Sequence, residues 1–453
     1  MKVVKFGGSS LASGEQVKKV FDIVLSDADR KIVVVSAPGK RFADDRKVTD
    51  LLIELGDRHL KGLETAEILA AVVLRYAQIA EELGLSGEIV SSIKTHLLEL
   101  LHNDHINEAR YIDAIKASGE DCNARLIAAY FQSRGVQAAY VDPKAAGLLV
   151  EETKGTALVL KEAYTNLRSL SEWPGILIFP GFFGYNEAGE VVTFSRSGSD
   201  ITGSILANGT GAALYENFTD VDAVYSVNPN TVPNPKEIRE LTYREMRELS
   251  YAGFSVFHDE ALIPAFEAGI PVQIKNTNNP AAPGTRIVNE RKNTNGPVIG
   301  IASDDDFCSI YVNKYLMNKE IGFGRKLLSI LEDFGLTYEH SPSGIDDLSI
   351  ILRQKQMTPD TEKQILERIQ ADLLPDEVKV EHNLSLIMMV GEGMRRNIGT
   401  AARASKALAD AGVNIEMINQ GSSEVSMMFG VKEAQEKRAV QALYEEFFAK
   451  VLA

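Results

Sequence analysis

The chain has 453 residues, of which 45% are hydrophobic and 25% charged, with a formal net charge of -15 at pH 7. This length exceeds what one hydrophobic core organises, so several domains are expected, and the composition is too apolar for a disordered chain. The acidic balance disfavours nucleic acid and anionic membranes as partners, because both require clustered Lys and Arg.

Cysteine usage and the N-terminal sequence both favour a cytoplasmic protein. The only cysteines, Cys122 and Cys308, can neither staple a chain of this length nor build a metal site. Met1 leads directly into an apolar strand-like run, with no cleavable leader pattern, and no apolar run is long enough to cross a bilayer. Neither secretion nor membrane insertion is therefore expected.

Short β-rich runs alternate with long amphipathic stretches from the N-terminus onward. Helices are predicted at residues 66–83 and 89–101, and strands at residues 3–6, 32–36, 137–141, 176–179, 212–218 and 271–274. This alternation predicts one α/β domain over residues 1–290, with an internal sheet. Residues 291–297 are polar and without apolar period, which predicts a linker.

The rest of the chain repeats itself at an offset of 77 positions, from 321 to 398. Six residues recur at this spacing: Ile321, Gly322, Gly335, Glu339, Gly344 and Ser349 match Ile398, Gly399, Gly412, Glu416, Gly421 and Ser426. Each copy has the pattern of a βαββαβ module. Because the second copy ends one strand short, residues 298–306 plus 383–453 are predicted to form one module, with residues 307–382 inserted as the other.

A lysine and paired glycines follow the first predicted strand. Gly7, Gly8 and Ser9 let backbone N–H groups approach phosphate oxygens, while Lys5 can neutralise charge between a phosphoryl donor and its acceptor. A tight strand-to-helix turn with a solvated lysine explains the same residues equally well.

Three further segments carry candidate binding residues. Residues 194–200 end in small residues and Asp200 at a predicted helix start, where Arg196 could fork onto a carboxylate, although Asp200 could be only an N-cap. Thr219, Asp220 and Tyr225 follow a strand and suit a nucleotide. Glu120 lies in a predicted small-residue turn and suits a substrate ammonium, although stabilisation of a helix start is its commoner role.

Together these motifs resemble the aspartate kinases of the amino acid kinase superfamily. The resemblance rests on Lys5 to Ser9, residues 33–36 with Val48-Thr49-Asp50, Ser118-Gly119-Glu120, residues 195–200 and Phe218-Thr219-Asp220. It covers the whole chain and is closest to lysine-sensitive, single-function bacterial enzymes of Bacillus-like organisms. It implies a three-layer α/β/α sandwich followed by two ferredoxin-like ACT modules, and transfer of the ATP γ-phosphoryl group to aspartate.

The resemblance also implies roles for individual residues. Lys5 and Asp200 would flank the transferring phosphoryl group, and the aspartate site would contain Ser36, Thr49, Glu120, Arg196 and Ser199. The nucleotide site would contain Lys5, Gly7, Gly8, Ser9, Thr219, Asp220 and Tyr225. Asn230 and Ser255 stand where the family has an arginine and a lysine, so Lys275 is a candidate substitute. Mg²⁺ is expected to arrive with ATP, and no dedicated metal site is predicted.

The tail predicts feedback control by lysine, alone or with threonine. The implied effector residues are Met317, Gly322, Phe323, Thr337, Tyr338, Glu339 and Ser341. ACT modules usually pair between subunits, which implies a homodimer, or a tetramer built from it. Two alternatives remain at this stage: a kinase of the same fold acting on glutamate, acetylglutamate or a nucleoside monophosphate, and a non-catalytic amino-acid sensor.

Overall fold

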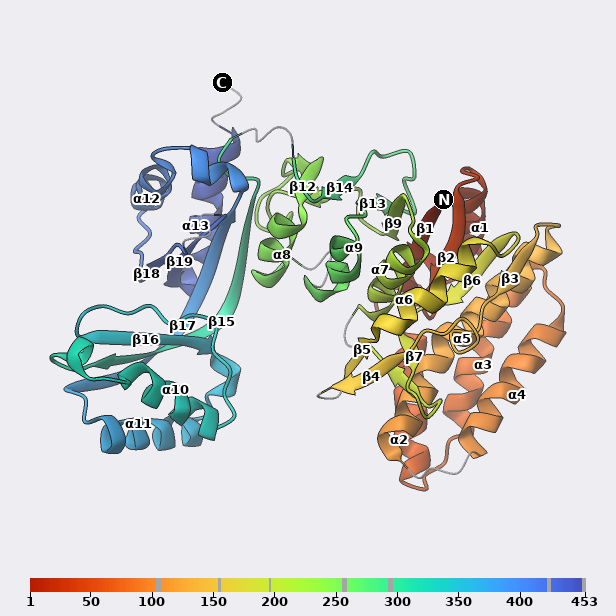
Figure 1. Ribbon diagram of the computed structural model, residues 1–453, viewed down its shortest axis with the longest axis horizontal. Coiled ribbons are helices and arrows are strands. Elements are labelled where there is room, and N and C mark those ends of the chain that lie inside the picture. The colour runs from red at the N-terminus through yellow and green to blue at the C-terminus, as the bar shows by residue number, and fades with distance from the viewer. Residues whose placement is uncertain are drawn as a thin grey trace. The chain divides into compact units, whose positions relative to one another are not determined.

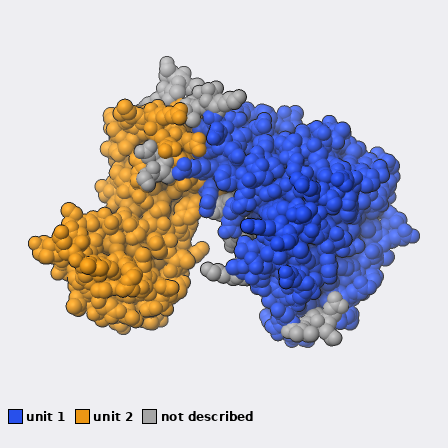
Figure 2. Space-filling model, in the orientation of Figure 1, with its two compact units in different colours: residues 1–224, 237–247, 255–291 blue, residues 225–236, 248–254, 292–453 orange. Residues whose placement is uncertain are grey.

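The computed structural model describes residues 1–102, 107–153, 156–194, 197–254, 259–291, 296–421 and 425–449. The chain forms two compact units (Figure 2). Unit 1 comprises residues 1–224, 237–247 and 255–291, and unit 2 comprises residues 225–236, 248–254 and 292–453. Two short stretches of the predicted catalytic range 1–290 therefore belong to unit 2. In the described ranges, no helix has both the length and the apolar character that crossing a membrane requires.

Unit 1 is built on an eight-stranded sheet in the order β12-β14-β13-β9-β1-β2-β6-β3. Its strands are β1 (Lys2–Phe6), β2 (Arg30–Val35), β3 (Ala138–Tyr140), β6 (Ile176–Pro180), β9 (Leu214–Thr219), β12 (Glu240–Thr242), β13 (Val272–Asn276) and β14 (Thr285–Val288). Every pairing described for this sheet is parallel except that of β13 with β14. The six strands predicted from β-rich runs are all confirmed as members of this sheet.

Helices cover both faces of the sheet (Figure 1). One face packs against α1 (Gly14–Leu25), α2 (Val48–Leu60), α3 (Ala66–Leu83), α4 (Gly87–His102) and α5 (Glu108–Ser133), through a shared core that includes Phe6 and Phe218. The other face carries α6 (Lys161–Leu167), α7 (Gly198–Thr210) and α9 (Ile263–Glu267). The three-layer α/β/α prediction is confirmed.

Smaller elements connect these layers. The hairpins β4 (Val150–Thr153) with β5 (Thr156–Val159) and β7 (Phe183–Tyr185) with β8 (Val191–Thr193) precede α7. The strands β10 (Val224–Tyr225) and β11 (Glu237–Ile238) and the helix α8 (Tyr243–Tyr251) follow β9. The helix α8 is shared: residues 243–247 belong to unit 1 and its last residues to unit 2.

Unit 2 contains one antiparallel sheet in the order β16-β15-β17-β19-β18. Its strands are β15 (Gly300–Asn313), β16 (Asp347–Arg353), β17 (Glu377–Val390), β18 (Met417–Asn419) and β19 (Ser426–Lys432). The helices α10 (Phe323–Asp333) and α11 (Pro359–Leu373) pack on one half, and α12 (Thr400–Asp410) and α13 (Glu436–Tyr444) on the other. Two separate hydrophobic cores result, one for each module.

The two modules share their long central strands. Residues 300–304 of β15 pair with residues 386–390 of β17, whereas residues 307–313 pair with residues 377–384. Each half of the sheet therefore uses one part of both strands, which supports the proposed insertion of the first module within the second. The repeated glycines also have a structural reason: Gly322 and Gly399 precede α10 and α12 with φ of 81° and 88°, in the left-handed region that favours glycine.

Candidate active site

A buried ion pair lies at the carboxyl end of β1. Lys5 Nζ is 2.6 Å from Asp200 Oδ1 on α7, and the two residues are only 7% and 9% exposed. Asn217 on β9 donates to the same carboxylate oxygen at 2.6 Å. In the sheet register Asn217 lies beside Lys5, so both side chains leave the same face toward α7. The pair is therefore fixed by two strands and a helix.

The entry to α7 explains why small residues precede Asp200. Ser197 has φ of 61° and caps the helix, so Asp200 is its third residue and not its N-cap. A Cβ on Gly198 would lie 2.6 Å from the Phe182 ring, and one on Gly181 would lie 2.6 Å from Ser199 Cβ. These close approaches bring the helix N-terminus, with its favourable field for anions, against the end of β6.

Glu120 lies in the middle of α5, so the predicted small-residue turn at residues 117–120 is wrong. The glycine serves packing, since a Cβ on Gly119 would lie 3.0 Å from Ala37 Cβ. Glu120 is 5% exposed, and among the residues that the structure describes its Oε2 has no hydrogen-bond partner. Burial raises the pKa of Glu120 to about 8, although the Ala37 backbone N–H donates to its carboxyl group. A cationic ligand group would satisfy this oxygen and restore its charge.

Two pockets share a wall made of Ser36, Thr49 and Glu120. The first, of about 410 Å³, is also lined by Lys5, Phe182, Phe194 and residues 197–200. The second, of about 590 Å³, is also lined by Gly8, Ser9, residues 37–43, Lys47 and Asp220. Both open at the carboxyl edge of the parallel strands, where ligands of open α/β sheets bind. The structure thus brings together most of the residues predicted for catalysis and for aspartate.

Not every predicted site residue lies at these pockets. Lys275 is paired in register with Phe218, the neighbour of Asn217, so it leaves the sheet on the face opposite to Lys5. Its pKa is lowered by burial, on the side of the sheet that carries Glu216. Thr219, another residue predicted for the nucleotide, donates a hydrogen bond from its Oγ1 to the neighbouring Asp220 carboxylate at 3.2 Å. Because Lys275 lies on the other face, it could bind a nucleotide only on the side of the sheet opposite to the Lys5–Asp200 pair.

Some predicted residues stand outside this picture. Arg196, Ser195 and Ser255 lie outside the described residues. Tyr225 belongs to unit 2, and its nucleotide role stays a prediction. Asn230, which stands where the family has an arginine, belongs to unit 2 as well. Gly7 is close to the ion pair, since a Cβ there would lie 3.6 Å from Lys5 Nζ.

The sequence patterns did not identify two asparagines that belong to the site. Asn217 holds Asp200, and Asn123 on α5 is fully buried and donates to the Ser36 carbonyl at 2.7 Å. A buried amide within a sheet strand, as at Asn217, is the signal that would have identified the first.

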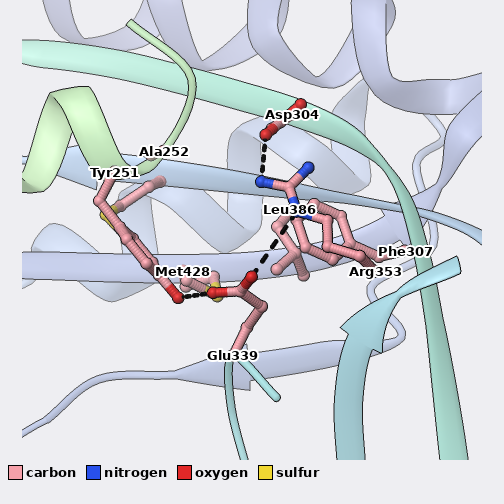
Figure 3. A pocket seen from close by; sticks show the side chains of 9 residues that line it. Tyr251, Ala252, Asp304, Phe307, Glu339, Arg353, Leu386 and Met428 are labelled. Carbon is pink, nitrogen blue, oxygen red and sulfur yellow. Dashed lines mark hydrogen bonds and ion pairs between the residues drawn. The ribbon is translucent and has the colours of Figure 1, made fainter. Parts of the chain in front are cut away.

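Glu339, the acidic residue among the predicted effector residues of unit 2, already has hydrogen-bonding and charged partners. Glu339 accepts a hydrogen bond from the Tyr251 hydroxyl, and its carboxylate is 3.6 Å from Arg353 Nε (Figure 3). Arg353 also pairs with Asp304 at 2.6 Å and stacks on the Phe307 ring. The cavity around these residues has a volume of about 10 Å³, room for no more than one water molecule.

The other predicted effector residues are mostly engaged in folding the first module. Met317 and Phe323 belong to its core and are 8% and 3% exposed. Thr337 bonds to Gln356 through its N–H and its hydroxyl, whereas Tyr338 and Ser341 are exposed. Glu339 is thus the member of the set that lines the cavity of Figure 3.

The fold and the site define a class of protein. The sheet is mostly parallel, its turn after β1 suits phosphate, Lys5 is a buried cation, and Glu120 has one unpartnered carboxylate oxygen among the described residues, which suits an ammonium. These features belong to a phosphotransferase for a small amino-acid-like substrate. Residues 1–276 match the sequence profile of the amino acid kinase family, and residues 387–447 match that of an ACT domain.

Comparison with individual proteins narrows this class. The chain is 69% identical to aspartokinase 3 of Bacillus subtilis (strain 168) over 452 residues, covering 100% of both chains. Its structure is similar to that of Clostridium acetobutylicum aspartate kinase, with a TM-score of 0.89, 37% identity, and coverage of 99% of this chain and 100% of that one. It is also similar to E. coli aspartokinase III in complex with aspartate and ADP, with a TM-score of 0.78, 26% identity, and coverage of 99% and 100%. The chain therefore belongs to the aspartokinases of the amino acid kinase family.

Proposed function

We propose that this chain transfers the γ-phosphoryl group of ATP to the β-carboxylate of L-aspartate in the two joined pockets of unit 1. The product is 4-phospho-L-aspartate, which opens the biosynthesis of lysine, threonine and methionine. The observation that carries this proposal is the buried Lys5–Asp200 pair beside the unpaired oxygen of Glu120. It offers a cation for the reacting phosphoryl group and an anion for the substrate ammonium.

The chemistry needs positioning and charge neutralisation more than proton transfer. A carboxylate acceptor is already ionised near neutral pH, so no general base is required. Its approach to a triphosphate is opposed by repulsion between anions, which a nearby cation reduces. Lys5 Nζ supplies that charge from a largely buried position, and Asp200 and Asn217 hold it in place.

Aspartate is held by the wall that the two pockets share. Glu120 Oε2 takes the α-ammonium, and Ser36, Thr49 and Ser199 contribute polar groups around the substrate carboxylates. Arg196, two residues before α7 in sequence, is proposed to hold the α-carboxylate. Since the neutral form of Glu120 prevails below its pKa of about 8, aspartate binding has to displace a proton.

The nucleotide lies on the other side of this wall. The Gly8–Ser9 backbone and Asp220 line the larger pocket, where the phosphates would meet N–H groups. Mg²⁺ in kinases is held mainly by phosphates, waters and one or two carboxylates, and Asp220 is the carboxylate here that fits such a role. Mg²⁺ would neutralise part of the triphosphate charge.

Regulation is proposed to act through unit 2. A solved relative, E. coli aspartokinase III, is described in complex with lysine and aspartate. In this chain Glu339 would exchange the Tyr251 hydroxyl for an ammonium group of lysine. Tyr251 ends α8, so this exchange acts on a helix whose first residues belong to unit 1. A homodimer formed through the ACT modules, or a tetramer, is the proposed assembly.

Trapping of the acyl phosphate with hydroxylamine tests the proposed reaction. We expect ATP-dependent hydroxamate with aspartate, less with glutamate, and a fall on addition of lysine. Signal with another acceptor but not with aspartate would overturn the substrate. Silence with every acceptor, together with retained lysine binding, would favour a non-catalytic sensor.

A further inference from the structure

The loop between β2 and α2 forms much of the larger pocket. Its residues 36–43 and Lys47 line the cavity next to the Gly8–Ser9 turn. Four of its side chains, Lys40, Arg41, Arg46 and Lys47, are cationic and exposed, and Arg46 is paired with Glu54 on α2 at 2.5 Å. An ordinary solvated surface loop also contains such residues. A role in ligand binding requires that the loop is held in place and that some of its positive charges are not paired with carboxylates.

The loop is held by a buried arginine from α3. Arg75 is 4% exposed, and its guanidinium donates to both carboxylate oxygens of Asp45, each at 2.8 Å. The same group donates to the carbonyls of Gly39 at 2.8 Å and Arg46 at 3.1 Å. Four contacts from one rigid group fix both arms of the loop.

The loop also packs directly on the phosphate turn. Gly39 N–H donates to the Gly8 carbonyl at 2.8 Å. A Cβ on Gly39 would lie 2.6 Å from the Gly8 carbonyl carbon, and one on Gly8 would lie 3.0 Å from the Ala37 oxygen. Since only glycine fits at this contact, the loop keeps a fixed position against the turn. Lys40 directly follows Gly39 in the sequence, so its backbone is fixed there too.

The loop cations differ in whether their charge is already compensated. Arg41 is paired with Asp45 at 2.8 Å, and its hydrogen bond to that carboxylate, together with the charge of Arg75, holds the pKa of Asp45 well below its usual range. Lys40 Nζ donates to the Ala43 carbonyl at 3.2 Å. Within the described ranges, neither Lys40 nor Lys47 forms an ion pair with a carboxylate. Their positive charges therefore remain available to a ligand.

We propose that Lys40 and Lys47 bind the triphosphate of the nucleotide and so act as specificity-determining residues for it. The inference rests on the proposed function. Both lysines line the pocket that contains the Gly8–Ser9 turn and Asp220, and they are absent from the lining of the pocket that contains Lys5, Ser199 and Asp200. A polyanion on that side would meet two uncompensated cations on a loop already fixed in place, with little ordering left to oppose binding.

Charge removal with a matched control tests this proposal. Lys40→Gln, Lys47→Gln and the double variant are compared with Lys61→Gln, which removes a lysine at the far end of α2. We expect each single variant to raise KM for MgATP and Kd for MgADP about tenfold, as for loss of one charge-assisted contact, and the double variant to raise them further. KM for aspartate should stay within about twofold in the same assays. Lys47→Arg should restore most of the affinity.

Calorimetric titration with MgADP separates this inference from the reaction itself. If the wild-type chain binds MgADP but gives no hydroxamate from aspartate, the proposed function fails while the lysines are still tested. Unchanged MgADP affinity in the double variant would overturn the inference, as would a change confined to KM for aspartate.

Discussion

Glu120 in unit 1 and Glu339 in unit 2 are both proposed to receive an ammonium group, but they differ in what already contacts them. Glu120 is buried in α5 with one carboxylate oxygen unpartnered, beside pockets of several hundred Å³. Glu339 is bonded to Tyr251 and lies near Arg353, around a cavity of about 10 Å³. The first is a prepared site that costs folding free energy until a ligand arrives, whereas the second must give up existing partners.

This difference suggests how one chain separates catalysis from control. A preorganised carboxylate favours strong binding of the substrate, because little has to move. An occupied carboxylate binds its ligand only by exchange, so binding changes the structure around it, as an effector must.

The largest effect is expected from the buried ion pair of unit 1. Lys5→Met should lower kcat by about 10² to 10³-fold, because Lys5 neutralises charge where the phosphoryl group transfers. Steady-state rates of hydroxamate formation measure this, with Lys61→Met as a control that should keep the wild-type rate. A variant that folds, as judged by its thermal transition, and keeps kcat within twofold would remove Lys5 from the mechanism.

A second large effect should follow from Glu120. Glu120→Gln should weaken aspartate binding by about 10 to 100-fold, the worth of a charged hydrogen bond. Because burial raises the pKa of Glu120 to about 8, its carboxylate form is scarce at lower pH. Wild-type affinity for aspartate should therefore rise by up to about tenfold per pH unit as the pH approaches 8. In Glu120→Gln this rise should disappear, and its persistence would assign the pH dependence to another group.

A smaller effect is expected at the occupied carboxylate. Tyr251→Phe removes the hydroxyl that donates to Glu339, so lysine should inhibit at a concentration about fivefold lower. Tyr315→Phe, at an exposed position of unit 2, is the matched control and should leave inhibition unchanged. Inhibition curves at fixed aspartate and ATP give the comparison. Weaker inhibition in Tyr251→Phe would mean that the hydroxyl assists the effector and does not compete with it.

The smallest effect concerns the packing behind Glu120. Gly119→Ala places a methyl group 3.0 Å from Ala37 Cβ and 3.1 Å from Leu52 Cδ1, so it should lower the free energy of unfolding by about 1 to 3 kcal/mol. Gly87→Ala, where no atom of the described residues lies within 4 Å of the added Cβ, should not destabilise the chain. Chemical denaturation measures both, and equal stabilities would mean that α5 can shift without cost.

Much of this arrangement could be predicted from the sequence, for reasons that differ by element. The parallel strands follow from apolar runs bounded by Gly, Pro and Asn, and Lys5, Asp200 and Glu120 follow from motif resemblance. The helix through Ser118 and Gly119 was missed, because small residues at a helix contact resemble a turn when the partner, here Ala37, is unknown. The orientation of Lys275 depends on register between strands, and the Tyr251–Glu339 contact joins residues 88 positions apart. Local sequence patterns contain information on neither the strand register nor this long-range contact.

Proton release on aspartate binding tests most directly whether Glu120 is a prepared site for the substrate ammonium. Calorimetric titrations near pH 7 in buffers of different ionisation enthalpy count these protons. We expect the wild-type chain to release up to about one proton per bound aspartate, and Glu120→Gln to release none. Equal proton counts in the two proteins would contradict it and show that Glu120 does not exchange its proton for the substrate.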